Sequence, residues 1–80
     1  MKEKTTEAIA AQERAELYFM AHPRGAAAAR RPRLVKHGQL WVALLGANVT
    51  QGIVGIGPTV EAALHAFDIR YLNYVRPMAA

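Results

Sequence analysis

Three polar residues near the C-terminus have the spacing of a small catalytic or metal-binding group. Glu61, His65 and Asp68 stand at positions i, i+4 and i+7, which places them on one side of a helix. Carboxylate and imidazole groups in this arrangement could hold a metal ion or transfer a proton. Such a site needs further ligands, and the other two histidines, His22 and His37, lie in a predicted linker and a predicted turn. We therefore interpret the group as a solvated helix face and expect no metal site.

The chain also lacks the nucleophiles and phosphate-binding loops of common enzyme classes. It contains no cysteine and no serine, which excludes a disulfide, a thiolate metal site and a serine or cysteine nucleophile. The glycines from Gly52 to Gly57 precede a helix, but they match neither the dinucleotide-binding pattern nor the P-loop. We interpret them as a strand bulge or a close backbone approach. The sequence predicts a protein that is not an enzyme, with no catalytic residue, no cofactor and no small-molecule substrate.

Positive charge is concentrated in one segment of the chain. The net charge is +4, and residues 21–40 contain five bases and no acid, whereas residues 41–60 contain no charged residue. The five bases are Arg24, Arg30, Arg31, Arg33 and Lys36. Such a segment can clamp the phosphates of a nucleic acid without sequence specificity, or it can simply keep a linker solvated.

The length and composition limit the chain to one domain with a thin core. It has 80 residues, and sixteen of its apolar residues are alanines. The first residues mix acids with bases and do not resemble a secretory signal. Glycines and polar residues interrupt the uncharged stretch from His37 to Val60, so it does not resemble a membrane span. The sequence predicts a cytoplasmic protein that does not associate with a membrane.

The N-terminal part of this single domain, residues 1–80, is predicted to be a helix and a linker. An alanine-rich helix covers 5–21, with Thr5 or Thr6 as its cap. Its larger apolar residues do not form one clean stripe, so this helix must pack against another element to be stable. Prolines, a glycine and arginines make 22–32 the basic linker.

The C-terminal part is predicted to be a sheet followed by a helix. The apolar period changes to two after the linker, which predicts three strands over 33–57, the third of them at 49–56. Thr59 is the predicted cap of a long helix over 59–76. The apolar stripe of this helix must be buried against the sheet and consists of Val60, Ala63, Leu64, Phe67, Tyr71, Tyr74 and Val75. The predicted fold class is α+β, with an N-terminal helix, a three-stranded antiparallel sheet and a long C-terminal helix on one sheet face (αβββα).

The central strand of the predicted sheet is apolar on both faces. Alternate residues point to opposite sides, and the two sets are Leu40, Val42 and Leu44 on one side and Trp41, Ala43 and Leu45 on the other. One helix can cover only one face, so the second must meet the N-terminal helix, a partner chain or another protein. The candidate interaction face consists of Leu40, Val42, Leu44 and Ile53.

The junction between the third strand and the C-terminal helix resembles a known DNA-binding domain. Residues 55–68, GIGPTVEAALHAFD, resemble the strand-to-helix junction of the ethylene-response-factor type, which also occurs in bacterial mobile elements. Gly38 and Trp41-Val42-Ala43 look like the second-strand motif of that family, with one extra residue between them. The run Thr-Val-Glu-Ala-Ala is also similar to HicB-type antitoxin domains and double-stranded-RNA-binding domains. The resemblance implies the same three strands and helix that the apolar periodicity predicts.

In the ethylene-response-factor family, the sheet face opposite the helix reads the major groove with arginines, a tryptophan and a glutamate. Carried onto this sequence, that face would consist of Arg33, Val35, His37, Leu40, Val42, Leu44, Gln51 and Ile53. Aliphatic side chains cannot make the hydrogen bonds that specify bases or bind phosphates. The resemblance supports the fold and argues against the DNA-binding mode of that family.

Two functions follow from the sequence. The first is a small non-enzymatic regulatory or accessory module, of bacterial, prophage or mobile-element origin, which binds a protein partner or a second copy through the apolar sheet face. The alternative is a nucleic-acid-binding module that uses the basic segment 24–36. The sequence leaves open the partner, the oligomeric state, the choice of DNA or RNA, and whether the N-terminal helix packs in cis or swaps between chains.

Overall fold

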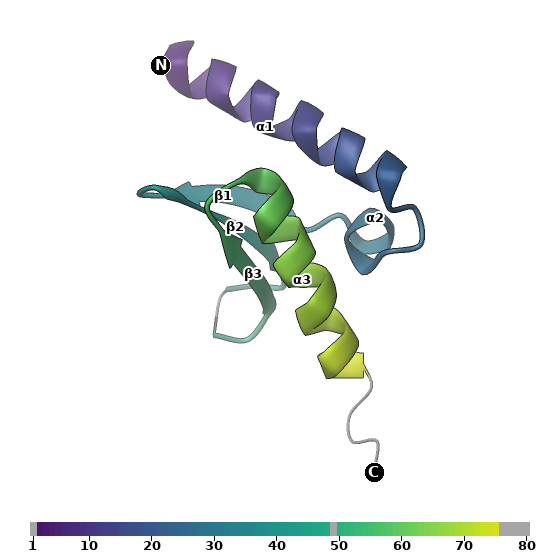
Figure 1. Cartoon of the computed structure of the whole chain (residues 1–80). Helices are drawn as coiled ribbons and strands as arrows, with labels where there is room; N and C mark the ends of the chain where they lie inside the picture. Colours follow the sequence, from purple (N-terminus) through teal and green to yellow (C-terminus); the bar gives the residue numbers. More distant parts are fainter. Residues whose placement is uncertain (1, 49, 76–80) are drawn as a thin grey trace.

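Three helices and three strands make up the computed structural model, which describes residues 2–48 and 50–75. In chain order they are α1 (Lys2–Ala21), α2 (Ala26–Arg30), β1 (Arg33–His37), β2 (Leu40–Leu45), β3 (Ile53–Gly57) and α3 (Val60–Val75). The strands form an antiparallel sheet in the order β1-β2-β3, α3 packs on one face of it, and α1 packs on α3 and α2 (Figure 1). The predicted α+β class and element order are confirmed, with the short helix α2 inside the predicted linker.

Helix α3 begins at the predicted cap. The Oγ1 atom of Thr59 accepts a hydrogen bond from the amide of Ala62 at 3.0 Å, and its carbonyl oxygen accepts one from the amide of Ala63 at 3.0 Å. The side chains of the predicted stripe that are fully buried are Val60, Ala63, Leu64 and Phe67. Tyr74, predicted on the same stripe, is 70% exposed, because α3 extends beyond the strands at its C-terminal end (Figure 1).

Two glycines of β3 let α3 lie directly on the strand backbone. A Cβ atom on Gly55 would lie 2.7 Å from the Cα of Phe67, and one on Gly57 would lie 2.6 Å from the Cβ of Ala62. Both glycines pair with β2 in regular register, so β3 has no bulge at Gly55. Of the two interpretations made from the sequence, the close backbone approach is correct.

The register of the sheet determines which side chains face α3. Ala43 lies opposite Leu34 of β1 and Gly55 of β3, and Leu45 lies opposite Ile53. Ala43 is fully buried, and the other apolar side chains of this row pack against the same core, so this row faces α3. The alternate row forms what we name the outer sheet face, and its members are Arg33, Val35, His37, Leu40, Val42, Leu44, Val54 and Ile56.

The third strand starts later than predicted, and this places Ile53 on the other face of the sheet. Asn48 Oδ1 accepts hydrogen bonds from the amides of Thr50 and Gln51, both at 2.9 Å, and so holds the chain in a turn before β3. Residue 49, the predicted first residue of the strand, lies outside the described residues. Ile53 pairs with Leu45 and packs against the core, so its prediction as an interaction-face residue is wrong.

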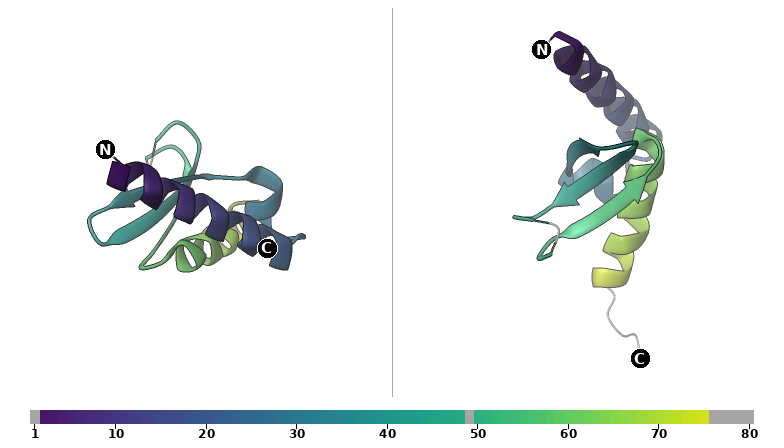
Figure 2. Two further views of the ribbon diagram at one scale, coloured as in Figure 1. Left: turned by 90° about the horizontal axis from the view of Figure 1, so that it is seen from above. Right: turned by 90° about the vertical axis from the view of Figure 1, so that its left-hand side faces the viewer.

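Helix α1 packs through alanines and two aromatic residues. It begins at Lys2, before the predicted start at residue 5, so neither Thr5 nor Thr6 is its cap. The buried side chains of α1 are Ala11, Ala15, Tyr18 and Phe19. Its larger aliphatic residues Ile9, Leu17 and Met20 are exposed. Figure 2 shows α1 crossing near one end of α3 rather than over the outer sheet face.

Candidate interaction surface

Of the three polar residues of α3, Glu61 and Asp68 have separate structural contacts. The carboxylate of Glu61 accepts hydrogen bonds from Arg14 at 2.7 and 2.9 Å, and this contact lowers the pKa of Glu61 below its usual value. His65 is exposed, and Asp68 is half-buried against α1 and α2. Among residues 2–48 and 50–75, no group of three or more histidine or acidic side chains could hold a metal ion.

Asp68 links the three helices. Its Oδ2 atom accepts a hydrogen bond from the hydroxyl of Tyr18 in α1 at 2.9 Å, and its Oδ1 atom accepts one from the backbone amide of Ala27 in α2 at 2.7 Å. Ala27 is fully buried, so in the folded chain Asp68 takes the place of water at that amide. Burial, assisted by the bond to Asp68, raises the pKa of Tyr18 above its ordinary value. The role of Asp68 is therefore structural.

The raised pKa of Tyr18 predicts a loss of stability in alkali. In the unfolded chain this hydroxyl ionises near pH 10, whereas in the folded protein it stays protonated at higher pH. Its contribution to the free energy of unfolding is complete below about pH 10 and is lost as the pH rises further. We expect urea unfolding to show a larger loss between neutral and alkaline pH for the unmodified protein than for Tyr18→Phe. Equal losses would contradict the prediction, because the other tyrosines and the lysines are present in both proteins.

Arg30 and Arg31, two of the five predicted phosphate-binding residues, contact side chains of the neighbouring helices. The guanidinium of Arg31 forms an ion pair with Glu16 and lies over the ring of Phe19. Arg30 donates a hydrogen bond from Nε to the hydroxyl of Tyr71 at 2.9 Å. Both arginines lie at the end of α2, where Arg31 has a left-handed backbone with a φ of 51°. These contacts fix α2 against α1 and α3.

The other three bases lie at separate places. Arg24 lies between α1 and α2, and Arg33 lies at the start of β1 on the outer sheet face. Lys36 lies on the α3-facing row, with its Nζ atom 5.5 Å from the centre of the Trp41 ring. The structure therefore does not bring the five bases of segment 24–36 together into one patch.

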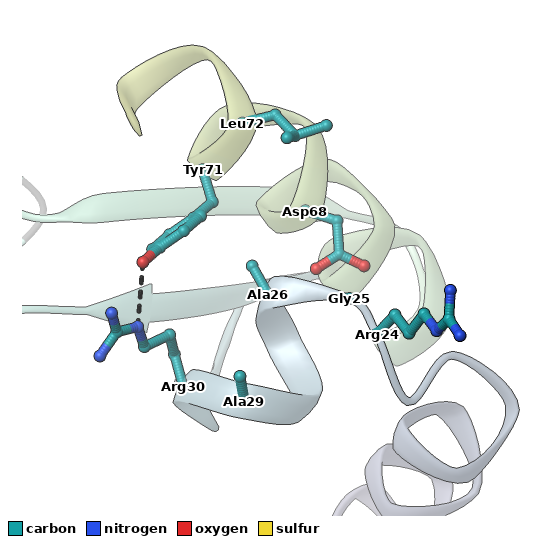
Figure 3. A pocket seen from close by; sticks show the side chains of 8 residues that line it. All are labelled: Arg24, Gly25, Ala26, Ala29, Arg30, Asp68, Tyr71 and Leu72. Carbon is teal, nitrogen blue, oxygen red and sulfur yellow. Dashed lines mark hydrogen bonds between the residues drawn. The ribbon is translucent and has the colours of Figure 1, made fainter. Parts of the chain in front are cut away.

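A pocket between α2 and α3 was not expected from the sequence. Its volume is about 440 Å³, and it is lined by Arg24, Gly25, Ala26, Ala29, Arg30, Asp68, Tyr71 and Leu72. In Figure 3 the side chains of Arg24 and Arg30 lie at opposite ends of the pocket and point away from each other. Asp68 lies between them, and both of its oxygens accept hydrogen bonds. The two cationic groups do not converge on a common point, so the pocket is not organised to hold a single anion.

The outer sheet face is the most distinctive surface of the molecule. Val35, Leu40 and Ile56 are 45, 43 and 53% exposed, and Val42 and Val54 are half-buried. In the right-hand view of Figure 2, α3 lies on one side of the sheet and none of the described helices lies on the other. The prediction that β2 is apolar on both faces is confirmed, and the described part of α1 packs on α3 and α2 instead of covering the second face.

Leu44 belongs to this face but does not contribute to its exposed surface. It is only 7% exposed, because the loop between β2 and β3 folds back over it. A Cβ atom placed on Gly52 of that loop would lie 3.0 Å from Leu44 Cδ1. Of the predicted interaction face, Leu40 and Val42 lie on the outer sheet face as predicted, whereas Leu44 is covered. The residues of β3 on this face are Val54 and Ile56 instead of Ile53. Gly55 and Gly57 could have indicated which residues of β3 face α3. Both lack a Cβ atom where the following helix lies directly on the strand, so Val54 and Ile56 must point to the other side.

Comparison with known proteins finds no family model, no curated protein and no solved structure that matches the chain. The resemblances to the ethylene-response-factor, antitoxin and RNA-binding domains therefore stay predictions from the sequence. Within residues 2–48 and 50–75, no helix is long and apolar enough to cross a membrane.

Proposed function

We propose that the chain is a non-enzymatic interaction module that binds another protein through its outer sheet face. The observation that carries this proposal is a continuous aliphatic surface on three adjacent strands, made by Val35, Leu40, Val42, Val54 and Ile56. Removing such surface from water contributes about 25 cal/mol per Å², so a protein that covers it gains binding energy. The function that this surface supports best is a regulatory or accessory role, in which the chain acts by binding a partner protein or dissociating from it.

The outer sheet face suits a protein better than a nucleic acid. Its centre offers only aliphatic side chains, which bind neither phosphate groups nor the polar edges of bases. Its polar members, Arg33 and His37, lie at the two ends of the edge strand β1. Phosphate binding by the basic segment 24–36 would need Arg30 and Arg31, and these already contact Tyr71 and Glu16. Nucleic-acid binding by segment 24–36 therefore has less support than protein binding.

Site-specific photo-crosslinking tests the proposal. We expect benzoylphenylalanine in place of Ile56 to give a discrete covalent adduct with a protein in cells that express the chain. The same group in place of His65, which is exposed on α3, is the matched control and should give none. The Ile56 adduct should also disappear when Val42, the cross-strand neighbour of Ile56, is changed to aspartate. An adduct of equal strength at both positions, or none at Ile56, would contradict the proposal.

A further inference from the structure

A second apolar surface of the molecule is the side of α1 that faces away from α3. Ile9, Leu17 and Met20 are 55, 64 and 74% exposed. At 3.6 residues per turn, these three residues and Glu13 fall within an arc of about 80°, opposite the buried side of the helix. We name these four residues the outward stripe of α1. A helix that buries alanines and exposes its larger aliphatic residues has its greatest potential for packing on this outward side.

The outward stripe and the outer sheet face differ in charge. Residues 17–60 contain no acidic residue, so the sheet and its connecting loops carry only basic and neutral side chains, and Arg33 on β1 is the cation of the outer sheet face. The outward stripe, in contrast, carries the exposed carboxylate of Glu13. The outward stripe therefore complements the outer sheet face in two properties: both surfaces are aliphatic, and they carry opposite charges.

The two surfaces also match in length. Ile9 and Met20 are separated by eleven helical steps, which at 1.5 Å each correspond to about 17 Å. Strands of five or six residues span about 17 to 20 Å. A helix that carries the outward stripe can therefore cover the outer sheet face from end to end. In the described part of the chain, α1 contacts α3 and α2 instead, so this helix would come from another molecule.

We propose that a second copy of the chain covers the outer sheet face with the outward stripe of its α1, and that the contact is made reciprocally in a symmetric dimer. This inference rests on the proposed function, since it names the partner of the same face. Three strands present a face only about 14 Å wide and about 17 to 20 Å long, an area of roughly 240 to 280 Å². This area is well short of the roughly 800 Å² that a partner usually buries in a stable interface. The reciprocal contact uses two surfaces of each copy. A sheet-to-sheet dimer would instead bury only one surface of each copy, with no acid near Arg33 of either copy.

Two charge variants at exposed positions test this pairing. Leu17→Lys places a cation on the outward stripe, and Ile56→Glu places an anion on the outer sheet face. Each variant alone should be monomeric in sedimentation equilibrium, with a dissociation constant raised more than about tenfold, because its new charge meets charges of the same sign. An equimolar mixture should recover the dimer, since one contact is then unmodified and the other pairs Lys with Glu. Asn73→Lys, on the exposed surface of α3, is the matched control and should dimerise like the unmodified protein.

The outcomes separate this inference from the proposed function. A dimeric Leu17→Lys variant would indicate sheet-to-sheet contact, and a dimeric Ile56→Glu variant would indicate contact between two α1 helices; either result would overturn the inference. An unmodified chain that stays monomeric up to about 100 µM would also overturn it, because a self-contact of useful strength is populated there. The proposed function would still stand if Ile56 then crosslinked to a different protein. Circular dichroism melts of each variant verify that a loss of dimer is not a loss of fold.

Discussion

Replacing Gly55 with alanine is expected to lower the free energy of unfolding by about 3 kcal/mol, at the upper end of the usual cost of overpacking. The added Cβ would lie 2.7 Å from the Cα of Phe67, and closer still to the amide nitrogen of Phe67 and the carbonyl oxygen of Ala63. These are backbone atoms of α3, which cannot rotate away as a side chain would. The helix must therefore move off the strand, and the core around Phe67 opens.

This loss is large for a protein of this size. At about 0.05 to 0.15 kcal/mol per residue, an 80-residue domain has a total stability of only about 4 to 12 kcal/mol. Urea unfolding followed by circular dichroism measures the change. Gly38→Asn is the matched control, because Gly38 has a φ of +65° in the turn between β1 and β2, nothing lies within 4 Å of an added Cβ, and asparagine tolerates that backbone. If the two variants were equally stable, the close approach of α3 to β3 would be wrong.

Local sequence signals predicted the helix-and-sheet layer of this fold well. The cap at Thr59 and the stripe from Val60 to Phe67 are short-range features, and both are found as predicted. The alternation along β2 likewise assigned opposite faces to Leu40 and Trp41. In each case the determining residues are close together in the sequence, so the period alone specifies which side is buried.

Structural features that depend on distant parts of the chain could not be predicted from the local sequence pattern. The phase of β3, and with it the position of Ile53, depends on how many residues the turn at Asn48 uses. The burial of Leu44 depends on where the loop that contains Gly52 lies. For α1, the larger apolar residues form no clean stripe in the sequence, so the buried side, which consists of two alanines with Tyr18 and Phe19, could not be assigned from the period.

The role of Asp68 was also hidden from sequence reasoning, because its partners lie 50 and 41 residues away in α1 and α2. Its spacing from Glu61 and His65 indicated a shared polar face, which is correct geometrically but unrelated to its contacts. A carboxylate on the polar side of an amphipathic helix is normally solvated. Here the absence of a side chain at Gly25 leaves space for it, since a Cβ at that position would lie 2.9 Å from Asp68 Oδ2.

Asp68→Ala is expected to cost about 3 kcal/mol of stability, because it removes two hydrogen bonds to a charged acceptor and leaves the buried amide of Ala27 without a partner. Asp68→Asn should cost about half as much, since its amide oxygen can still accept from Ala27 and its NH2 group can donate to the Tyr18 oxygen. Asn73→Ala, on the exposed surface of the same helix, is the control and should leave stability nearly unchanged. Urea unfolding measures all three, and equal losses for alanine and asparagine would contradict the hydrogen-bond explanation.

The loss should be local before it is global. Asp68 holds α1 and α2 to α3, whereas α3 is held to the sheet by Phe67, Leu64 and the glycines of β3. Amide hydrogen exchange of Asp68→Ala should therefore show protection falling first in α1 and α2 and persisting in β2 and α3. Since the orientation of the outward stripe depends on this attachment, the same variant should also weaken the proposed dimer, although Asp68 belongs to neither contact surface. A dimer of unchanged strength with a detached α1 would show that the stripe does not need to be held in place to bind.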